Sequence, residues 1–256
     1  MPDLHYATAG SGAPLLILHG LFGSSKNWHS YMRRYGEHFE VFCVDLRNHG
    51  QSFHSDLMDY ALMADDVAGL IAGLGLSDCR IIGHSMGGKT TMALAQRHPE
   101  MLSRMVVADI APVTYAHQYD DLIDPILRLD LTACGSRAEV DAALKADIPE
   151  DSLRSFLMHN LARGDDGFYW RVNFAAIKPR IGALTGFDAL PPDWQCEIPT
   201  QFIRGGNSDY VGDAEIRVIE RHFPGACIDT IDGAGHWLHA EKPADFVRLT
   251  LDFLQA

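Results

Sequence analysis

Residues 81–92, with the sequence IIGHSMGGKTTM, fit two chemical motifs at once. From Gly83 to Gly87 they read G-x-S-x-G, a sharp turn that presents a nucleophilic serine, here Ser85. From Gly83 to Thr90 they also read G-x-x-x-x-G-K-T, the pattern of a phosphate-binding P-loop. Both motifs need a strand before them and a helix after them. The rest of the chain must therefore decide between a reactive serine and a nucleotide site.

A reactive serine needs further groups at set places in the chain. It requires a general base, and the base requires an acid that fixes its tautomer. In hydrolases with this turn the chain order is serine, acid, histidine. Asp109 ends the run MVVAD, Asp209 lies in RGGNSDYV, and His236 lies in DGAGHWLH after a β-like run at residues 226–231. His236 is therefore the candidate base, and either Asp109 or Asp209 is the candidate acid.

Backbone N–H groups must also stabilise the negative charge that forms on the carbonyl oxygen of a substrate. The turn HGLFG at residues 19–23 directly follows an apolar run and offers such a group. The predicted oxyanion hole combines the N–H of Leu21 with that of Met86, the residue after the serine. A helix that starts behind Ser85 would add the positive end of its dipole.

The P-loop alternative explains less of the chain. It needs an aspartate at the end of another strand to hold Mg²⁺, and Asp109 could supply one. However, P-loops commonly follow the first strand of their domain, whereas two strong strand patterns precede residues 83–90 here. Several separate segments support a serine hydrolase and a single motif supports a P-loop NTPase. The hydrolase is the favoured prediction, and the alternatives are the NTPase and a non-catalytic hydrolase fold that binds a ligand.

The elements that must position these groups follow a regular order. Short apolar runs, typical of buried parallel strands, occur at residues 15–19, 41–45, 80–83, 105–109 and 201–204. Residues 60–76 and 246–253 carry apolar side chains at helical spacing. Alternating strands and helices predict an α/β fold with a mostly parallel sheet and helices on both of its faces.

The alternation stops between residues 112 and 194. This segment is rich in helix formers and aspartates, and it contains three helical stretches and no convincing strand. At about 80 residues it is too long for a loop in a compact domain. We therefore predict a helical cap over the strand ends, inserted within a single domain that spans residues 1–256. Some apolar residues of the cap should line the substrate pocket, and the sequence does not distinguish them from residues of the cap's own core. The candidates are Phe156, Leu157, Met158, Trp170 and Phe174.

Composition limits the partners. With 21 basic and 34 acidic residues the net charge is −13, which argues against nucleic acid or an anionic membrane as a main partner. Five scattered cysteines without C-x-x-C spacing favour a reducing compartment over a disulfide framework or a zinc site. We see no signal peptide and no apolar run near the ~18 residues of a membrane span. The expectation is a cytoplasmic protein that uses no metal or cofactor and acts on a small molecule, with its oligomeric state unspecified.

Three other polar residues near these motifs have simpler predicted roles. His19 and His49 are expected to brace their loops, and Lys89 is expected to cap or pair near the first turn of its helix.

Six motifs follow one another along the chain: LHGLFGSSKNW, DLRNHGQS, GHSMGGK, DIAPVTY, GGNSDYV and AGHWLHAEKP. In this order they resemble the motifs of the α/β-hydrolase superfamily, and in particular those of the small bacterial YbfF-type esterases and their mitochondrial relatives. The resemblance implies a serine esterase with a small helical cap that acts on short- to medium-chain acyl esters, with acyl-CoA thioesters as a second option.

The same resemblance assigns roles to individual residues. Ser85 matches the nucleophile of the family, His236 matches its base, and Leu21 and Met86 match its oxyanion donors. YbfF-like esterases use the aspartate of the DIAP motif, which favours Asp109 over the alternative at position 209.

Overall fold

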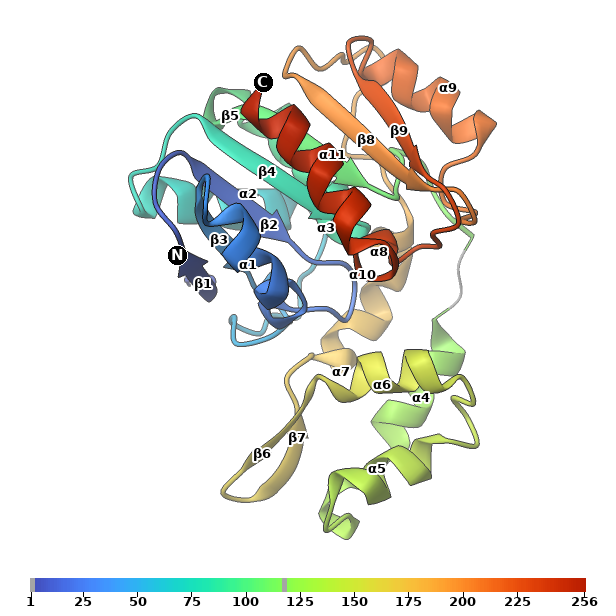
Figure 1. Cartoon of the computed structure of the whole chain (residues 1–256). Coiled ribbons are helices and arrows are strands. Elements are labelled where there is room, and N and C mark those ends of the chain that lie inside the picture. The colour runs from blue at the N-terminus through green and yellow to red at the C-terminus, as the bar shows by residue number, and fades with distance from the viewer. Residues whose placement is uncertain (1–2, 117–118) are drawn as a thin grey trace.

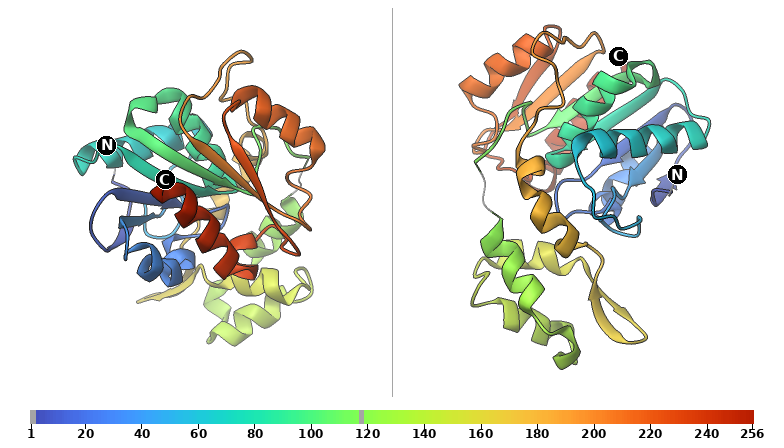
Figure 2. Two further views of the ribbon diagram at one scale, coloured as in Figure 1. Left: turned by 45° about the horizontal axis from the view of Figure 1, so that its top comes forward. Right: turned by 180° about the vertical axis from the view of Figure 1, so that it is seen from behind.

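A computed structural model describes residues 3–116 and 119–256. It consists of a twisted sheet with helices on both faces and a smaller group of helices at one edge (Figures 1 and 2). The strand order is β1-β3-β2-β4-β5-β8-β9, in which β1 runs antiparallel to β3 and the other neighbours are parallel. The predicted α/β fold with a mostly parallel sheet is confirmed.

The strands of this sheet agree closely with the apolar runs of the sequence. They are β1 (Tyr6–Ala9), β2 (Pro14–Leu18), β3 (Glu40–Val44), β4 (Cys79–His84), β5 (Leu102–Ala108), β8 (Thr200–Gly205) and β9 (Cys227–Ile231). Only β1 was not expected, because its sequence YATA contains no apolar run and it pairs at the edge of the sheet.

Two layers of helices cover the sheet. The helices outside the cap are α1 (His29–Tyr35), α2 (Tyr60–Gly73), α3 (Met86–Arg97), α9 (Asp213–His222), α10 (Leu238–Glu241) and α11 (Pro243–Gln255), with short 3-10 turns η1 (Ser25–Trp28) and η2 (Pro99–Met101). In β2, Leu16 and Leu18 pack into the core under α2 and α3, whereas Leu15 and Ile17 pack into the core under α1 and α11. Both faces of the strands are thus buried, which explains their unbroken apolar sequence.

The segment between β5 and β8 forms the cap. It contains α4 (Asp120–Arg128), η3 (Leu131–Ala133), α5 (Arg137–Leu144), α6 (Asp151–Met158), β6 (Leu161–Gly164), β7 (Gly167–Trp170), α7 (Phe174–Ile177), η4 (Lys178–Arg180) and α8 (Ile181–Thr185). The three expected helical stretches correspond to α4, α5 and α6. The expectation of no strand was wrong, because β6 and β7 pair as an antiparallel hairpin. Its turn signal, Asp166 followed by Gly167, was present in the sequence.

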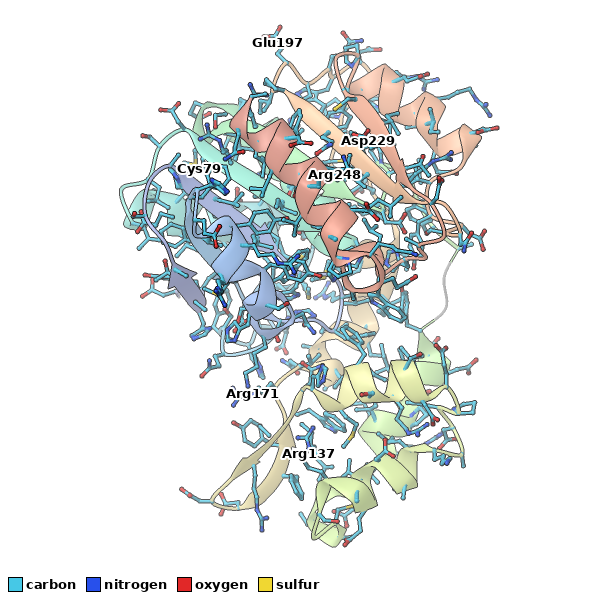
Figure 3. The ribbon with its side chains drawn as sticks, in the orientation of Figure 1. Cys79, Arg137, Arg171, Glu197, Asp229 and Arg248 are labelled. Carbon is cyan, nitrogen blue, oxygen red and sulfur yellow. The ribbon has the colours of Figure 1, made fainter. Side chains whose placement is uncertain are left out.

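Side-chain to backbone hydrogen bonds hold the cap together and tie it to the sheet domain. Arg137, labelled in Figure 3, donates to the carbonyl oxygens of Met158 and Leu161 at 2.6 and 2.7 Å. Asn160 donates to the carbonyl oxygen of Phe22 at 2.7 Å, across from the cap to the loop after β2. Within the described residues, every helix is too short or too polar to cross a membrane.

Candidate active site

Ser85 is the single residue between β4 and α3. Its φ of +53° lies in the left-handed region, which a residue with a Cβ adopts only when its surroundings enforce it. Its N–H donates to the carbonyl oxygen of Ala108 at 3.0 Å, and this bond helps to hold the turn. A Cβ on Gly83 would lie 2.3 Å from the carbonyl oxygen of Gly87, and one on Gly87 would lie 2.4 Å from that of Leu18. The two motif glycines are therefore required for the sharp turn that presents Ser85.

The residues from Gly83 to Thr90 do not form a phosphate-binding loop. The strand continues through His84 and the helix begins at Met86, so no loop remains to wrap a phosphate. Lys89 is only 1% exposed, so its ammonium is not presented to a phosphate.

Lys89 instead joins α3 to the end of the cap. Its ammonium donates to the carbonyl oxygens of Thr185 and Gly186, both at 2.9 Å, which differs from the expected contact near the first turn of α3. Burial lowers the pKa of this ammonium to about 7. The rings around it belong to Tyr60, Tyr115 and Phe187.

His236 stands between Ser85 and Asp109. Its Nε2 lies 3.1 Å from Ser85 Oγ, and its Nδ1 lies 2.8 Å from Asp109 Oδ2. Asp109 follows β5 directly, is fully buried and has a φ of +50°. Its carboxylate also accepts the N–H of Gly205 at 2.9 Å and the hydroxyl of Ser208. Gly205, Ser208 and His236 thus surround this buried carboxylate, which is placed to orient the imidazole.

Asp209 lies apart from this arrangement. Its side chain is exposed, and no hydrogen bond or ion pair joins it to His236 in the described parts of the chain. Its neighbours are the residues that approach the site: Ser208 binds the carboxylate of Asp109, and the ring of Tyr210 stacks on that of His236 with centroids 3.8 Å apart and planes 14° apart. The role of Tyr210 was missed, because the sequence does not show that the bend after β8 turns this ring toward His236.

The expected oxyanion donors border a small cavity beside Ser85. This cavity has a volume of about 30 Å³, and both Leu21 and Met86 line it. Neither backbone N–H donates to another group within residues 3–116 and 119–256, so both remain available to a ligand oxygen. The N–H of the next residue, Phe22, is taken by His49 Nε2 at 3.1 Å.

Two histidines brace the loop that carries Leu21, in agreement with their expected roles. His19 Nε2 accepts the N–H of Leu46 at 3.1 Å, while its Nδ1 lies 2.8 Å from the carbonyl oxygen of Gly20. His49 Nδ1 lies 2.9 Å from the carbonyl oxygen of Arg47. Burial lowers the pKa of both imidazoles, and that of His49 falls to about 3. Each ring can therefore accept one hydrogen bond and donate another near neutral pH.

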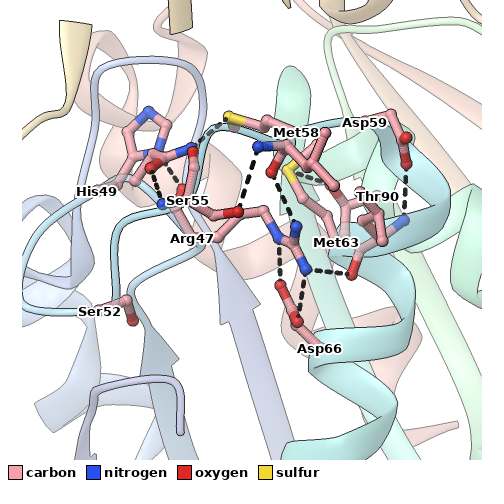
Figure 4. Close-up of polar contacts among 12 residues, drawn as sticks. Arg47, His49, Ser52, Ser55, Met58, Asp59, Met63, Asp66 and Thr90 are labelled. Atoms are coloured by element: carbon pink, nitrogen blue, oxygen red, sulfur yellow. Dashed lines mark hydrogen bonds and ion pairs between the residues drawn. The ribbon is translucent and has the colours of Figure 1, made fainter. Parts of the chain in front are cut away.

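The loop that carries His49 is itself anchored to α2, as Figure 4 shows. The guanidinium of Arg47 forms two hydrogen bonds with the carboxylate of Asp66, at 2.5 and 2.8 Å, and also binds the carbonyl oxygens of Leu57 and Leu62. This side chain is almost fully buried. Arg47 and His49 of the DLRNHGQS motif thus connect α2 to the turn that carries Leu21.

A second, much larger cavity opens between the sheet edge and the cap. Its volume is about 860 Å³, and both Ser85 and His236 border it. Its apolar walls include Phe22, Trp28, Leu122, Ile148, Leu153, Phe156 and Trp237. Of the cap residues considered from the sequence, Phe156 lines this cavity, whereas Leu157, Met158, Trp170 and Phe174 do not.

Comparison with known proteins gives consistent matches over nearly the whole chain. The sequence pattern of the alpha/beta hydrolase fold family matches residues 13–243. The sn-1-specific diacylglycerol lipase ABHD11 of Danio rerio is 36% identical over 256 residues, which cover 96% of this chain and 80% of that protein. Esterase YbfF of Escherichia coli is 32% identical over 245 residues, 95% of this chain and 94% of that one. A solved structure, titled marine microorganism esterase, superposes with a TM-score of 0.95 at 38% identity and covers 99% of this chain and 100% of its own.

Proposed function

The chain belongs to the α/β-hydrolase family as an esterase or lipase, and we propose that it cleaves carboxylic esters through an acyl-enzyme on Ser85. The observation that carries this proposal is the hydrogen-bonded series from Ser85 Oγ through His236 to the buried carboxylate of Asp109. A serine at a strained turn, a base within reach of its hydroxyl and an acid behind the base are the groups that acyl transfer requires.

In the proposed reaction His236 takes the proton of the Ser85 hydroxyl while the oxygen attacks the ester carbonyl carbon. The oxyanion that forms accepts hydrogen bonds from the N–H groups of Leu21 and Met86, and the N-terminus of α3 adds its positive dipole end. His236 then gives its proton to the leaving oxygen, and the alcohol departs. Water activated by the same imidazole hydrolyses the acyl-enzyme.

We assign the acid role to Asp109 rather than Asp209. The carboxylate of Asp109 lies on the Nδ1 side of His236, where it can fix the tautomer that leaves Nε2 free to accept the serine proton. Burial of the carboxylate favours this role because little water competes with the imidazole. The exposed side chain of Asp209 lacks this contact.

We further propose that the acyl group is of short to medium length. The cavity next to Ser85 and both expected oxyanion donors is small, which supports a limit on the acyl side. An acyl-CoA thioester presents the same type of carbonyl carbon to the serine, but its leaving group is highly charged.

The five unpaired cysteines support a reducing, cytoplasmic setting.

Labelling with a fluorophosphonate, followed by peptide mapping, tests the nucleophile. We expect a single modification at Ser85 and competition by substrate. A parallel series of p-nitrophenyl acetate, butyrate, octanoate and palmitate tests the acyl length, with kcat/KM expected to fall beyond octanoate. A label on another residue would overturn the assignment, and complete absence of label would favour a ligand-binding protein. A preference for palmitate would overturn the limit on acyl length.

A further inference from the structure

The large cavity combines an apolar interior with an acidic rim. Four carboxylate side chains line it, and all four residues are exposed: Asp121, Asp147, Glu150 and Glu241. They come from α4, the start of α6 and the segment before it, and α10, so they lie on both the cap and the sheet domain (Figure 1). No lysine or arginine is among the described residues that line this cavity.

The position of the base determines which half of an ester occupies this space. His236 Nε2 must reach the leaving oxygen to protonate it, so the leaving group lies on the side of His236. Ser85 and Leu21 border both cavities, but His236 borders only the large one and Met86 only the small one. At about 30 Å³ the small cavity has room for about two or three water molecules, enough for the first carbons of an acyl chain. The leaving group therefore has the cavity of about 860 Å³.

Little neutralises the negative charge at the rim. Asp147 pairs with Arg128 at 3.7 Å, but both side chains are at least half exposed, and such pairs interact weakly. Glu241 accepts the N–H of Gly235 at 2.7 Å, which leaves its charge in place. The net charge of −13 adds to the same field. A mouth lined by one sign of charge repels ligands of that sign and slows their entry.

We propose that the natural leaving group is a bulky, largely apolar alcohol that is uncharged or cationic, and that the acidic rim discriminates against polyanionic leaving groups such as CoA. This proposal rests on the proposed function of Ser85. On this proposal the enzyme prefers neutral esters to acyl-CoA thioesters because of the charge of the leaving group, and not because of the reactivity of the carbonyl.

Two acetate esters with matched ring systems test the proposal directly. Acetoxypyrene is neutral, and acetoxypyrene trisulfonate carries three negative charges on the same aromatic frame. We expect kcat/KM for the neutral ester to exceed that for the trisulfonate by at least about tenfold at low ionic strength. Added salt should reduce this ratio, because it screens charges at the exposed rim. Acetylthiocholine and acetyl-CoA, both acetyl thioesters, should show the same order, with the cation preferred.

A pair of double variants separates the rim from the overall charge of the protein. Asp147→Asn with Glu150→Gln removes two rim charges, and Asp165→Asn with Asp166→Asn removes two exposed charges from the hairpin turn, which does not line the cavity. The ratio compared is kcat/KM for acetoxypyrene divided by kcat/KM for the trisulfonate. We expect the rim double variant to lower this ratio severalfold and the hairpin double variant to leave it unchanged.

The outcomes distinguish this proposal from the one on which it rests. Equal kcat/KM for the neutral and trisulfonated esters would overturn the leaving-group proposal while Ser85 still accepts the fluorophosphonate label. The same would follow if both double variants changed the ratio equally, because the effect would then reflect net charge alone. An enzyme that cleaves neither ester and takes no label would overturn the proposed function and this inference together.

Discussion

The carboxyl edge of the sheet and the cap hold their side chains by different means. At the sheet edge, Ser85 and Asp109 follow neighbouring parallel strands, both have left-handed backbone angles, and the carboxylate is fully buried. In the cap, the groups that face the large cavity include exposed residues such as Glu150, and the ion pairs that order α6, such as Arg154 with Asp151, have one exposed partner.

This difference assigns separate tasks to the two regions. A left-handed angle at a residue with a Cβ costs on the order of 1–2 kcal/mol, and the backbone bonds around the serine turn offset that cost. The geometry at the sheet edge is therefore fixed before a substrate binds, as preorganised electrostatic catalysis requires. The cap can vary its side chains without disturbing that geometry. Changes at the edge should alter the reaction by orders of magnitude, and changes in the cap should alter which substrate is used.

The largest effect is expected for Ser85→Ala. Removal of the proposed nucleophilic oxygen should lower kcat for ester hydrolysis by about 10⁴-fold or more and abolish fluorophosphonate labelling. Circular dichroism and thermal unfolding should show an intact fold, because the backbone of the turn tolerates alanine as well as serine. Substantial turnover by this variant would mean that another group performs the attack.

The two aspartates give the next largest contrast. Asp109→Asn should lower kcat by about 10³- to 10⁴-fold, because an amide no longer holds the correct tautomer of His236. Asp209→Asn removes an equal charge from the neighbouring loop and should lower kcat little. Comparison of kcat for the two variants on one ester decides between them. Collapse of activity in Asp209→Asn alone would reverse our assignment of the acid.

The same contrast explains how much could be predicted from the sequence. Strands buried on both faces leave unbroken apolar runs, and the carboxyl ends of parallel strands meet at one edge of a sheet. From these two rules and the serine motif alone, Ser85, His236 and one of two aspartates could be expected to converge. The local sequence could not choose between Asp109 and Asp209, since the choice depends on which loop turns inward.

The cap was less predictable for a physical reason. Its helices pack through contacts between residues far apart in the chain, and an amphipathic pattern does not reveal which neighbour a helix will face. Phe156 was one of several candidates for the cavity wall, and its neighbours Leu157 and Met158 are buried within the cap. The contact of Lys89 with the end of α8 likewise depends on the path of the chain between two residues that are 96 positions apart.

A substitution in the cap should show the smaller, selective effect. Phe156 lines the large cavity, and its ring lies 5.7 Å from that of Trp237. Phe156→Ala should lower kcat/KM for an ester of a bulky alcohol by about tenfold, because the alcohol loses an apolar contact. Labelling by a small fluorophosphonate should change much less. Leu127→Ala, at an exposed position of α4 outside the cavity, is the matched control. A large loss of labelling in the Phe156 variant would show that the cap also shapes the catalytic geometry.

The smallest expected effect concerns a histidine at the boundary between the two regions. His239 is 7% exposed, its ring stacks on that of Trp28 at a centroid distance of 4.5 Å, and its Nδ1 has no hydrogen-bond partner among the described residues. Burial, reinforced by the nearby imidazole of His236, lowers the pKa of His239 to about 3. An unfolded chain would protonate this imidazole near pH 6.5.

Between these two pKa values the unfolded chain binds more protons at His239 than the folded one, so the free energy of unfolding falls as the pH drops below about 6.5. His239→Phe keeps an aromatic ring against Trp28 and removes this proton uptake together with the unpaired nitrogen. Between about pH 6.5 and about pH 5, the free energy of unfolding measured in urea should fall less steeply with decreasing pH for this variant than for the unmodified protein. The two slopes should differ by up to about 1.4 kcal/mol per pH unit. At about pH 8 both imidazole states are neutral, and the two proteins should differ only through packing. Parallel slopes for both proteins below pH 6.5 would mean that His239 is protonated in the folded state, and the cavity wall beside His236 would then carry a positive charge.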